Sequence, residues 1–358
     1  MVLSRRSAGV SFCLLLASGA GFAQGYAIIS PSAAQHMSEL AGTMEGRYAI
    51  SVASKNLGRM PAPVPRIHVE GTLPHQGIFD QSIAALGELG LIRDFALAYR
   101  LTGDRQYLEQ VERFIGAWMS TYQLSYNPID ETGLDALMLA NDLCRDDFSP
   151  KLREQVESFL RKMVEGYLTS IANLKKPDTT NWQSLRIKLI TMGAFSLGDR
   201  NLTQAAKAAF EDQIAANVYA DGTLEDFHQR DALHYVTYDL DPLLMAAEAA
   251  HAHGMDWFHW QSPTGSSLGA AVSWLVPYAE GVKQHEEFVH SGVPFDKERM
   301  QAGVAHFTKV WDPKESLATL GIAAAMDPQF RAVVDSMRSK PGYYVNHWIV
   351  LGLWQQPM

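Results

Sequence analysis

Residues 84–122 read AALGELGLIRDFALAYRLTGDRQYLEQVERFIGAWMSTY, and this stretch decides the fold class. Apolar side chains recur every three or four residues through 84–100 and again through 105–122, which places them on one face of a helix. Thr102 and Gly103 lie between the two runs, and a glycine after a periodic run is a typical helix end. The stretch therefore predicts two helices joined by a tight turn.

The same pattern continues along the chain. Short breaks that contain proline, glycine or aspartate separate further helical runs. These runs cover residues 131–144, 149–172, 181–197, 202–219, 232–253 and 268–279. Helices that arrive in pairs over about 250 residues, without a repeat of fixed period, favour a closed ring of helical hairpins over a solenoid. We predict an all-α (α/α) toroid, an incomplete barrel of hairpins.

The predicted toroid domain covers residues 80–358. Residues 24–79 contain several prolines and are expected to form an irregular lead-in that wraps the ring. Residues 343–351 form the one run whose spacing also suits a strand. No Ser-, Pro- or Gly-rich linker divides the chain, so we expect a single folded domain after the lead-in.

The first 23 residues have the pattern of a signal peptide. Arg5 and Arg6 precede an apolar stretch at 8–17, and Gly21 and Ala23 occupy the −3 and −1 positions of a cleavage site. The pattern predicts export, to the periplasm in a Gram-negative cell. Cleavage removes one of the two cysteines and leaves Cys144, so the mature chain has no internal disulfide. No later segment is apolar for long enough to cross a membrane.

Composition excludes several classes of protein. The chain has 358 residues, of which 47% are hydrophobic and 19% charged, so it is neither a disordered chain nor a disulfide-stapled miniprotein. Its net charge of −9 argues against a nucleic-acid partner. There is no phosphate-binding loop, dinucleotide fingerprint or nucleophile elbow, and the histidines near residue 255 lack a metal-ligand pattern. We expect no metal and no cofactor; the oligomeric state is left open.

Polar residues that carry chemistry cluster in two places. The first cluster, at 180–186, reads TNWQSLR, and the second, at 225–238, reads EDFHQRDALHYVTY. In the second cluster an apolar stripe faces the core, whereas His234, Tyr235 and Tyr238 fall on a different face of the same helix. Spacing alone allows two interpretations of these rings: contacts with a neighbouring helix, or a functional site.

These motifs carry a resemblance to a known family. The run at 230–243, RDALHYVTYDLDPL, resembles the signature helix of the alginate lyase family. Residues 181–183 (Asn-Trp-Gln) are similar to the Asn-Asn-His motif of polymannuronate lyases, and closer to an Asn-Trp-Gln-Ser-His-Arg version in other relatives. Residues 127–132 and 69–74 are also typical of those relatives. The resemblance runs from about residue 68 to 330.

The resemblance implies an (α/α) toroid that cleaves an acidic polysaccharide by β-elimination. The C5 proton of a uronate is weakly acidic, so the sugar carboxylate must be neutralised before that proton leaves. A base then takes the proton, and an acid protonates the glycosidic oxygen. The implied partner is therefore a uronic-acid polymer, with alginate as the first expectation and glucuronan as the second.

Four residues are the catalytic candidates. Tyr238 matches the family's catalytic tyrosine, and the resemblance implies that it acts as the acid and, in syn elimination, can also act as the base. Asn181 matches the asparagine that neutralises the carboxylate, although it also suits an N-cap. The family's arginine aligns with Asp231, and Arg230 stands one residue away. His234 lies one turn before Tyr238 and could polarise it.

The family's motif histidine is absent, which leaves the base open. Trp182 or Gln183 stands at its position, and Leu185 replaces the histidine of the closer relatives. His228 or His234 could substitute. The residues predicted to bind substrate are Trp182, Gln183, Arg186, His228 and Tyr235, and basic residues at 175, 176 and 188 could line the groove.

Two other functions remain open at this point. A glycoside hydrolase on the same toroid would need paired carboxylates, for which Glu131 and Glu225 are candidates. A lyase-like protein that binds polysaccharide without cleaving it would be consistent with the missing motif histidine. The sequence does not distinguish endo from exo action.

Overall fold

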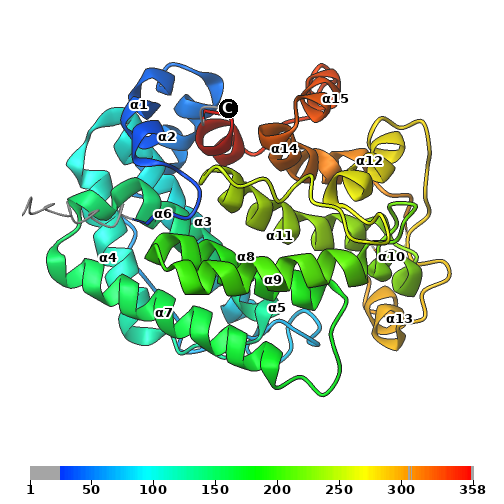
Figure 1. Ribbon diagram of the computed structural model, residues 1–358. Helices are drawn as coiled ribbons and strands as arrows, with labels where there is room; N and C mark the ends of the chain where they lie inside the picture. The colour runs from blue at the N-terminus through cyan, green and yellow to red at the C-terminus, as the bar shows by residue number, and fades with distance from the viewer. Residues whose placement is uncertain (1–24, 305–306, 308, 356–358) are drawn as a thin grey trace, which may run out of the picture.

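The computed structural model describes residues 25–304, 307 and 309–355 (Figure 1). The predicted signal peptide, residues 1–23, lies outside this described part. Across it the chain is helical, with three isolated β-bridges and no strand. The α-helices are α1 Pro31–His36, α2 Met44–Asn56, α3 Phe79–Thr102, α4 Arg105–Thr121, α5 Pro128–Glu131, α6 Asp135–Cys144, α7 Pro150–Ala172, α8 Asn181–Leu197, α9 Arg200–Asn217, α10 Glu225–Arg230, α11 Leu233–His251, α12 Leu268–Ala279, α13 Pro294–Gln301, α14 Leu317–Met326 and α15 Pro328–Arg338.

Two hairpins use the same turn chemistry. Gly103 ends α3 with a left-handed φ of 71°, and Asp104 then caps α4 by accepting a hydrogen bond from the backbone of Gln106. Gly198 ends α8 with φ 62°, and Asp199 caps α9 in the same way. Glycine adopts this conformation without a side-chain penalty, so each pair of residues turns the chain back on itself.

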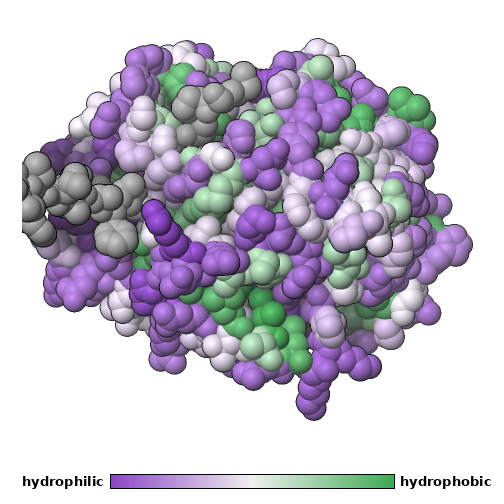
Figure 2. All heavy atoms as spheres, viewed as in Figure 1, coloured by the Kyte–Doolittle hydropathy of each residue, from purple (hydrophilic) through white to green (hydrophobic). Residues whose placement is uncertain are grey.

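The helices form an inner and an outer layer. Contacts run in sequence from α3 to α6, α8, α11 and α14, and these inner helices are buried on most of their faces. Helices α2, α4, α7, α9 and α15 each pack on an inner neighbour and bury only one face. The predicted all-α (α/α) toroid is therefore confirmed. The face seen in Figure 2 is mostly hydrophilic, with small apolar patches between polar side chains.

The structure corrects two details of the sequence prediction. The predicted lead-in is not irregular throughout: Ser30 caps α1 and Thr43 caps α2 through side-chain oxygens, and the longest irregular stretch is the segment between α2 and α3. The run at 343–351 forms no strand but leads into a π-helical turn at Ile349–Leu353. None of the described helices is both long and apolar enough to cross a lipid bilayer.

Candidate active site

A cavity of about 480 Å³ opens where the N-terminal ends of α8 and α11 meet α10 and α13. Six of the residues singled out from the sequence line it, together with a loop before α3 and the segment after α13. The six are Asn181, Trp182, Arg230, His234, Tyr235 and Tyr238. Residues from both polar clusters of the sequence thus face one common space.

The backbone at Asp231 explains how Arg230 reaches the cavity. Asp231 has φ 49° and ψ 51°, a left-handed conformation that few non-glycine residues adopt. Its side chain accepts a hydrogen bond from the backbone N–H of His290 at 2.9 Å, and its Oδ1 lies 3.5 Å from Nε2 of His285. Asp231 is therefore held against residues 285–290, and Arg230 lines the cavity.

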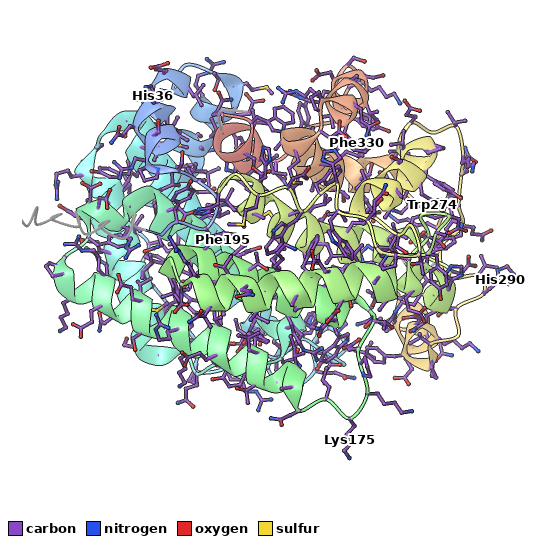
Figure 3. All side chains as sticks on the ribbon, in the orientation of Figure 1. His36, Lys175, Phe195, Trp274, His290 and Phe330 are labelled. Carbon is purple, nitrogen blue, oxygen red and sulfur yellow. The ribbon has the colours of Figure 1, made fainter. Side chains whose placement is uncertain are left out.

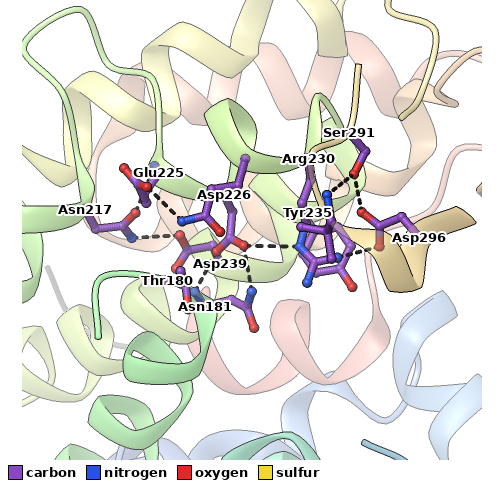
Figure 4. Close-up of polar contacts among 12 residues, drawn as sticks. Thr180, Asn181, Asn217, Glu225, Asp226, Arg230, Tyr235, Asp239, Ser291 and Asp296 are labelled. Atoms are coloured by element: carbon purple, nitrogen blue, oxygen red, sulfur yellow. Dashed lines mark hydrogen bonds and ion pairs between the residues drawn. The ribbon is translucent and has the colours of Figure 1, made fainter. Parts of the chain in front are cut away.

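Arg230 is held on three sides. Its Nη1 lies 2.5 Å from Oδ1 of the fully buried Asp296, and its Nε lies 3.7 Å from Oδ1 of Asp226. The guanidinium also lies 3.9 Å from the ring centre of Tyr235. Figure 4 shows these side chains in one continuous row. A cation fixed in this way binds an anion with little further loss of side-chain entropy.

Asn181 is not the N-cap of α8; Thr180 occupies that position. Asp226 of α10 accepts hydrogen bonds from the Asn181 backbone N–H at 2.6 Å and from its Nδ2 at 2.8 Å. Oδ1 of Asn181 is buried and has no hydrogen-bond partner within the described part of the chain. The amide is thus oriented by a carboxylate and retains capacity for a ligand.

Tyr238 is a neutral phenol. Burial raises its pKa far above the usual value, Tyr235 adds to the rise, and Arg299 opposes it. No other group in the described ranges makes a hydrogen bond with its hydroxyl. A phenol whose pKa is raised keeps its proton at neutral pH, so Tyr238 is suited to donate a proton, whereas accepting one would need a lowered pKa or a proton-accepting partner.

His234 does not polarise Tyr238 through a hydrogen bond. The two rings are almost parallel, with planes 9° apart and centres separated by 6.4 Å. Nδ1 of His234 instead lies 3.3 Å from Oε2 of Glu315, and its backbone N–H donates to Glu287. The imidazole is therefore oriented independently of the phenol, on the same face of α11.

Three predicted substrate-binding residues do not line the cavity. Gln183 and Arg186 lie on the face of α8 turned toward Asp178, where Arg186 forms an ion pair of 2.9 Å. His228 is exposed and pairs with the hydroxyl of Thr223 at 2.8 Å. The predicted basic strip is absent too: Lys188 is buried against Asp135, and Figure 3 shows Lys175 at an outer turn, pointing away from the molecule.

The cavity also contains an arginine that the sequence prediction missed. Arg299 of α13 lines it and donates a hydrogen bond of 2.7 Å to the hydroxyl of Tyr235. The loop 69–74 covers another side. In the sequence Arg299 belongs to DKERM, which has the composition of an ordinary solvated helix, so no local signal separated it from surface charge.

The paired carboxylates expected for a hydrolase are not at the cavity. Glu131 is fully buried and accepts hydrogen bonds from the hydroxyls of Tyr122 and Tyr167 at 2.9 and 2.5 Å. Glu225 is held by Tyr219 and Gln229 on the outer side of α10. Both carboxylates have structural partners. Within the described residues no group of three or more His, Cys, Asp or Glu side chains could hold a metal ion.

Comparisons with known proteins agree with the geometry. The alginate lyase family model matches residues 32–287. A polysaccharide lyase of Stenotrophomonas maltophilia is 32% identical over 127 residues, which cover 35% of this chain and 38% of that relative. The chain therefore matches well under half of that relative's length.

Solved structures share the fold. An alginate lyase from Bacteroides ovatus has a TM-score of 0.69 at 18% identity, with 92% of this chain and 100% of that chain covered. Alginate lyase A1-III from Sphingomonas species A1 has a TM-score of 0.55 at 17% identity, with 72% and 80% covered. A variant of A1-III complexed with a tetrasaccharide matches equally well, at 16% identity. Because the family model covers most of its length, this chain belongs to the alginate lyase family.

Proposed function

We propose that this protein is a polysaccharide lyase that cleaves a uronic-acid polymer by β-elimination at the cavity between α8 and α11. One observation carries the proposal: Asn181, Arg230, His234 and Tyr238 line a single cavity although they come from three helices. A cation, an amide, an imidazole and a neutral phenol are the groups that this reaction requires.

Each group has a distinct task. Arg230 and the amide of Asn181 bind the uronate carboxylate and stabilise the charge that develops when the C5 proton leaves. His234, which is the histidine among the described residues that line the cavity, takes that proton, while the phenol of Tyr238 keeps its own. The C4–O bond then breaks, the C4=C5 double bond forms, and Tyr238 gives its proton to the leaving oxygen. Proton exchange with water restores both groups.

We propose polymannuronate as the first substrate, because the chain belongs to the alginate lyase family, and glucuronan as the second. Mannuronate and glucuronate have the same configuration at C4 and C5, so the C5 proton and the leaving oxygen lie on the same face of the sugar. His234 and Tyr238 are also on one face of α11, one helical turn apart. Guluronate would need a base on the opposite face.

A panel of defined uronans tests the proposal. The expected result is ultraviolet absorbance from the conjugated C4=C5 bond with polymannuronate, less with glucuronan and none with polyguluronate. New reducing ends without this absorbance would indicate a hydrolase instead. Calorimetric binding without either signal would indicate the second candidate function, a lyase relative that binds polysaccharide without cleaving it. The residues at 182–185 favour this second candidate because none of them is the motif histidine.

We also propose that the protein is exported, to the periplasm in a Gram-negative cell, with residues 1–23 as its signal peptide. Arg5 and Arg6, the apolar stretch that follows and the small residues before Gln24 support this. The mass of the exported protein should correspond to a chain that begins at Gln24. An intact N-terminus in the cytosol would contradict the proposal.

A further inference from the structure

A pair of buried carboxyl groups lies directly beneath the cavity. Asp226 of α10 is 1% exposed and Asp239 of α11 is 0% exposed. Asp226 contacts both groups that are proposed to bind the substrate carboxylate: two hydrogen bonds come from Asn181, and Nε of Arg230 lies 3.7 Å away. Asp226 does not line the cavity itself, so it can act on substrate only through these neighbours.

Asp239 lies next to Asp226 in the protein interior. Oδ2 of Asp239 accepts a hydrogen bond of 2.7 Å from Asn217, while its Oδ1 is buried and accepts no hydrogen bond from the described residues. Two adjacent buried carboxyls cannot both carry a charge without a large cost. Burial and the neighbouring Asp226 raise the pKa of Asp239 well above its usual value, which makes Asp239 the protonated member of the pair.

Asn217 connects the Asp226–Asp239 pair to helix α9. Its amide nitrogen donates to Asp239, and its Oδ1 accepts the backbone N–H of Glu225 at 3.2 Å. The first turn of α10, the end of α9 and the interior of α11 are therefore joined at one point (Figure 4). Position 226 is fixed by three helices rather than by local loop geometry.

We propose that Asp226 is a positioning residue, which holds the Asn181 amide and the Arg230 guanidinium in the one arrangement that neutralises a substrate carboxylate. The amide nitrogen of Asn181 has two hydrogens, and one of them donates a hydrogen bond to Asp226. The second hydrogen is left to donate to the substrate carboxylate, while the buried Oδ1 can only accept a hydrogen bond. Without the acceptor at 226, the amide can rotate and its donor is no longer preorganised. This inference rests on the proposed lyase function.

A double-mutant cycle on kcat/KM tests the inference. We expect Asp226→Asn to lower kcat/KM of the full-length enzyme about 10²-fold, since a misplaced binding group has an effect of that size. We expect the same substitution to cost less than about 3-fold in an Asn181→Ala background, because residues that act as one unit are not additive. The matched control is Glu225→Gln, the same acid-to-amide change one residue earlier on α10, outside the cavity.

The cycle separates positioning from simple stabilisation. If Asp226 were only structural, Asp226→Asn would lower the melting temperature and reduce kcat/KM by the same factor in both backgrounds, which would overturn the inference. If Asp226→Asn fails to fold, Asp226→Glu keeps the charge, moves the acceptor by one methylene and should give the same non-additive pattern. Asp239→Asn retains a hydrogen-bond donor and should therefore reduce kcat/KM by a smaller factor than Asp226→Asn does.

Failure of the proposed function is a distinguishable result. If the wild type binds a mannuronate oligosaccharide but does not cleave it, the lyase proposal fails and the same cycle is measured on Kd by calorimetry. Additive effects on Kd would then overturn the inference, and non-additive effects would support it. A wild type that neither cleaves nor binds any uronan overturns both.

Discussion

At the scale of single residues, the proposed acid and the proposed base are two different side chains of one cavity. Burial keeps Tyr238 protonated, so the phenol can supply a proton to the leaving oxygen but cannot remove one from C5. Among the described residues that line the cavity, His234 supplies the imidazole, and Glu315 lies 3.3 Å from its Nδ1. An oriented imidazole beside a neutral phenol is a workable base and acid pair.

The assignment of the base predicts the behaviour of His234→Gln. Its rate of elimination should fall about 10²- to 10⁴-fold, because a positioned base is lost while a polar side chain of similar length remains. Steady-state kinetics measure this, with His228→Gln as the matched control, since His228 is exposed and outside the cavity. A His234→Gln enzyme that retains most of its turnover would refute the assignment.

A second prediction concerns Glu248 in the interior of α11. Its side chain is fully buried, neither carboxyl oxygen has a hydrogen-bond partner in the described part of the chain, and burial raises its pKa well above the usual value. The folded state therefore keeps the proton that the unfolded state loses above about pH 4.3, so wild-type stability falls as pH rises.

We expect Glu248→Met to be more stable than the wild type, by a margin that grows by about 1.4 kcal/mol per pH unit from pH 5 upward, up to the folded pKa. Urea denaturation at several pH values measures the margin. The stability margin of Glu248→Gln over the wild type should grow with pH in the same way. It should be smaller than that of Glu248→Met by a constant amount, because the glutamine amide is still a buried polar group. A margin that is constant between pH 5 and pH 8 would be inconsistent with a buried, protonated Glu248.

At the scale of elements, helix interiors were predictable and several helix starts were not. The bounds of α8 and α12 coincide with the predicted runs, because apolar periodicity and a closing glycine or a new cap define them locally. Helices α1, α2 and α13 are short or weakly apolar, so their periodic signal is faint. The turn at Asp231 depends on His290 and Phe288, which lie nearly sixty residues away.

The N-terminal segment illustrates such a long-range constraint. The carboxylate of Asp142 on α6 accepts the backbone N–H groups of Ala27, Ile28 and Ile29 at 2.7 to 3.0 Å. These three residues are buried, so their amides have no access to water once the acceptor is lost.

Asp142→Ala should therefore lower the free energy of unfolding by about 3 kcal/mol or more. Amide hydrogen exchange at residues 27–29 should accelerate. Exchange in α8 should accelerate only as far as the lower global free energy of unfolding requires. Asp142→Asn retains one acceptor oxygen, so its free energy of unfolding should fall by less than that of Asp142→Ala. Unchanged exchange at 27–29 in the alanine variant would show that Asp142 does not anchor the segment.

At the scale of the whole molecule, the toroid assembles the site from distant segments. The inner helices bring the starts of α8 and α11 together, and these were the two motifs that the sequence identified. The loop 69–74, which the sequence marked only as typical of the family's relatives, and Arg299 of α13, which has no chemical signature of its own, complete the cavity. The sequence therefore identified six of the residues that line the cavity, but not Arg299.

The most direct test of the account is the ultraviolet absorbance produced from polymannuronate by the wild type and by Tyr238→Phe. The substitution keeps the ring and removes only the hydroxyl, for which no partner is found among the described residues, so the melting temperature should hardly change. We predict a rate about 10²- to 10⁴-fold below that of the wild type, as expected for the loss of a positioned acid. A Tyr238→Phe enzyme that produces the unsaturated sugar at a near-normal rate would contradict the account.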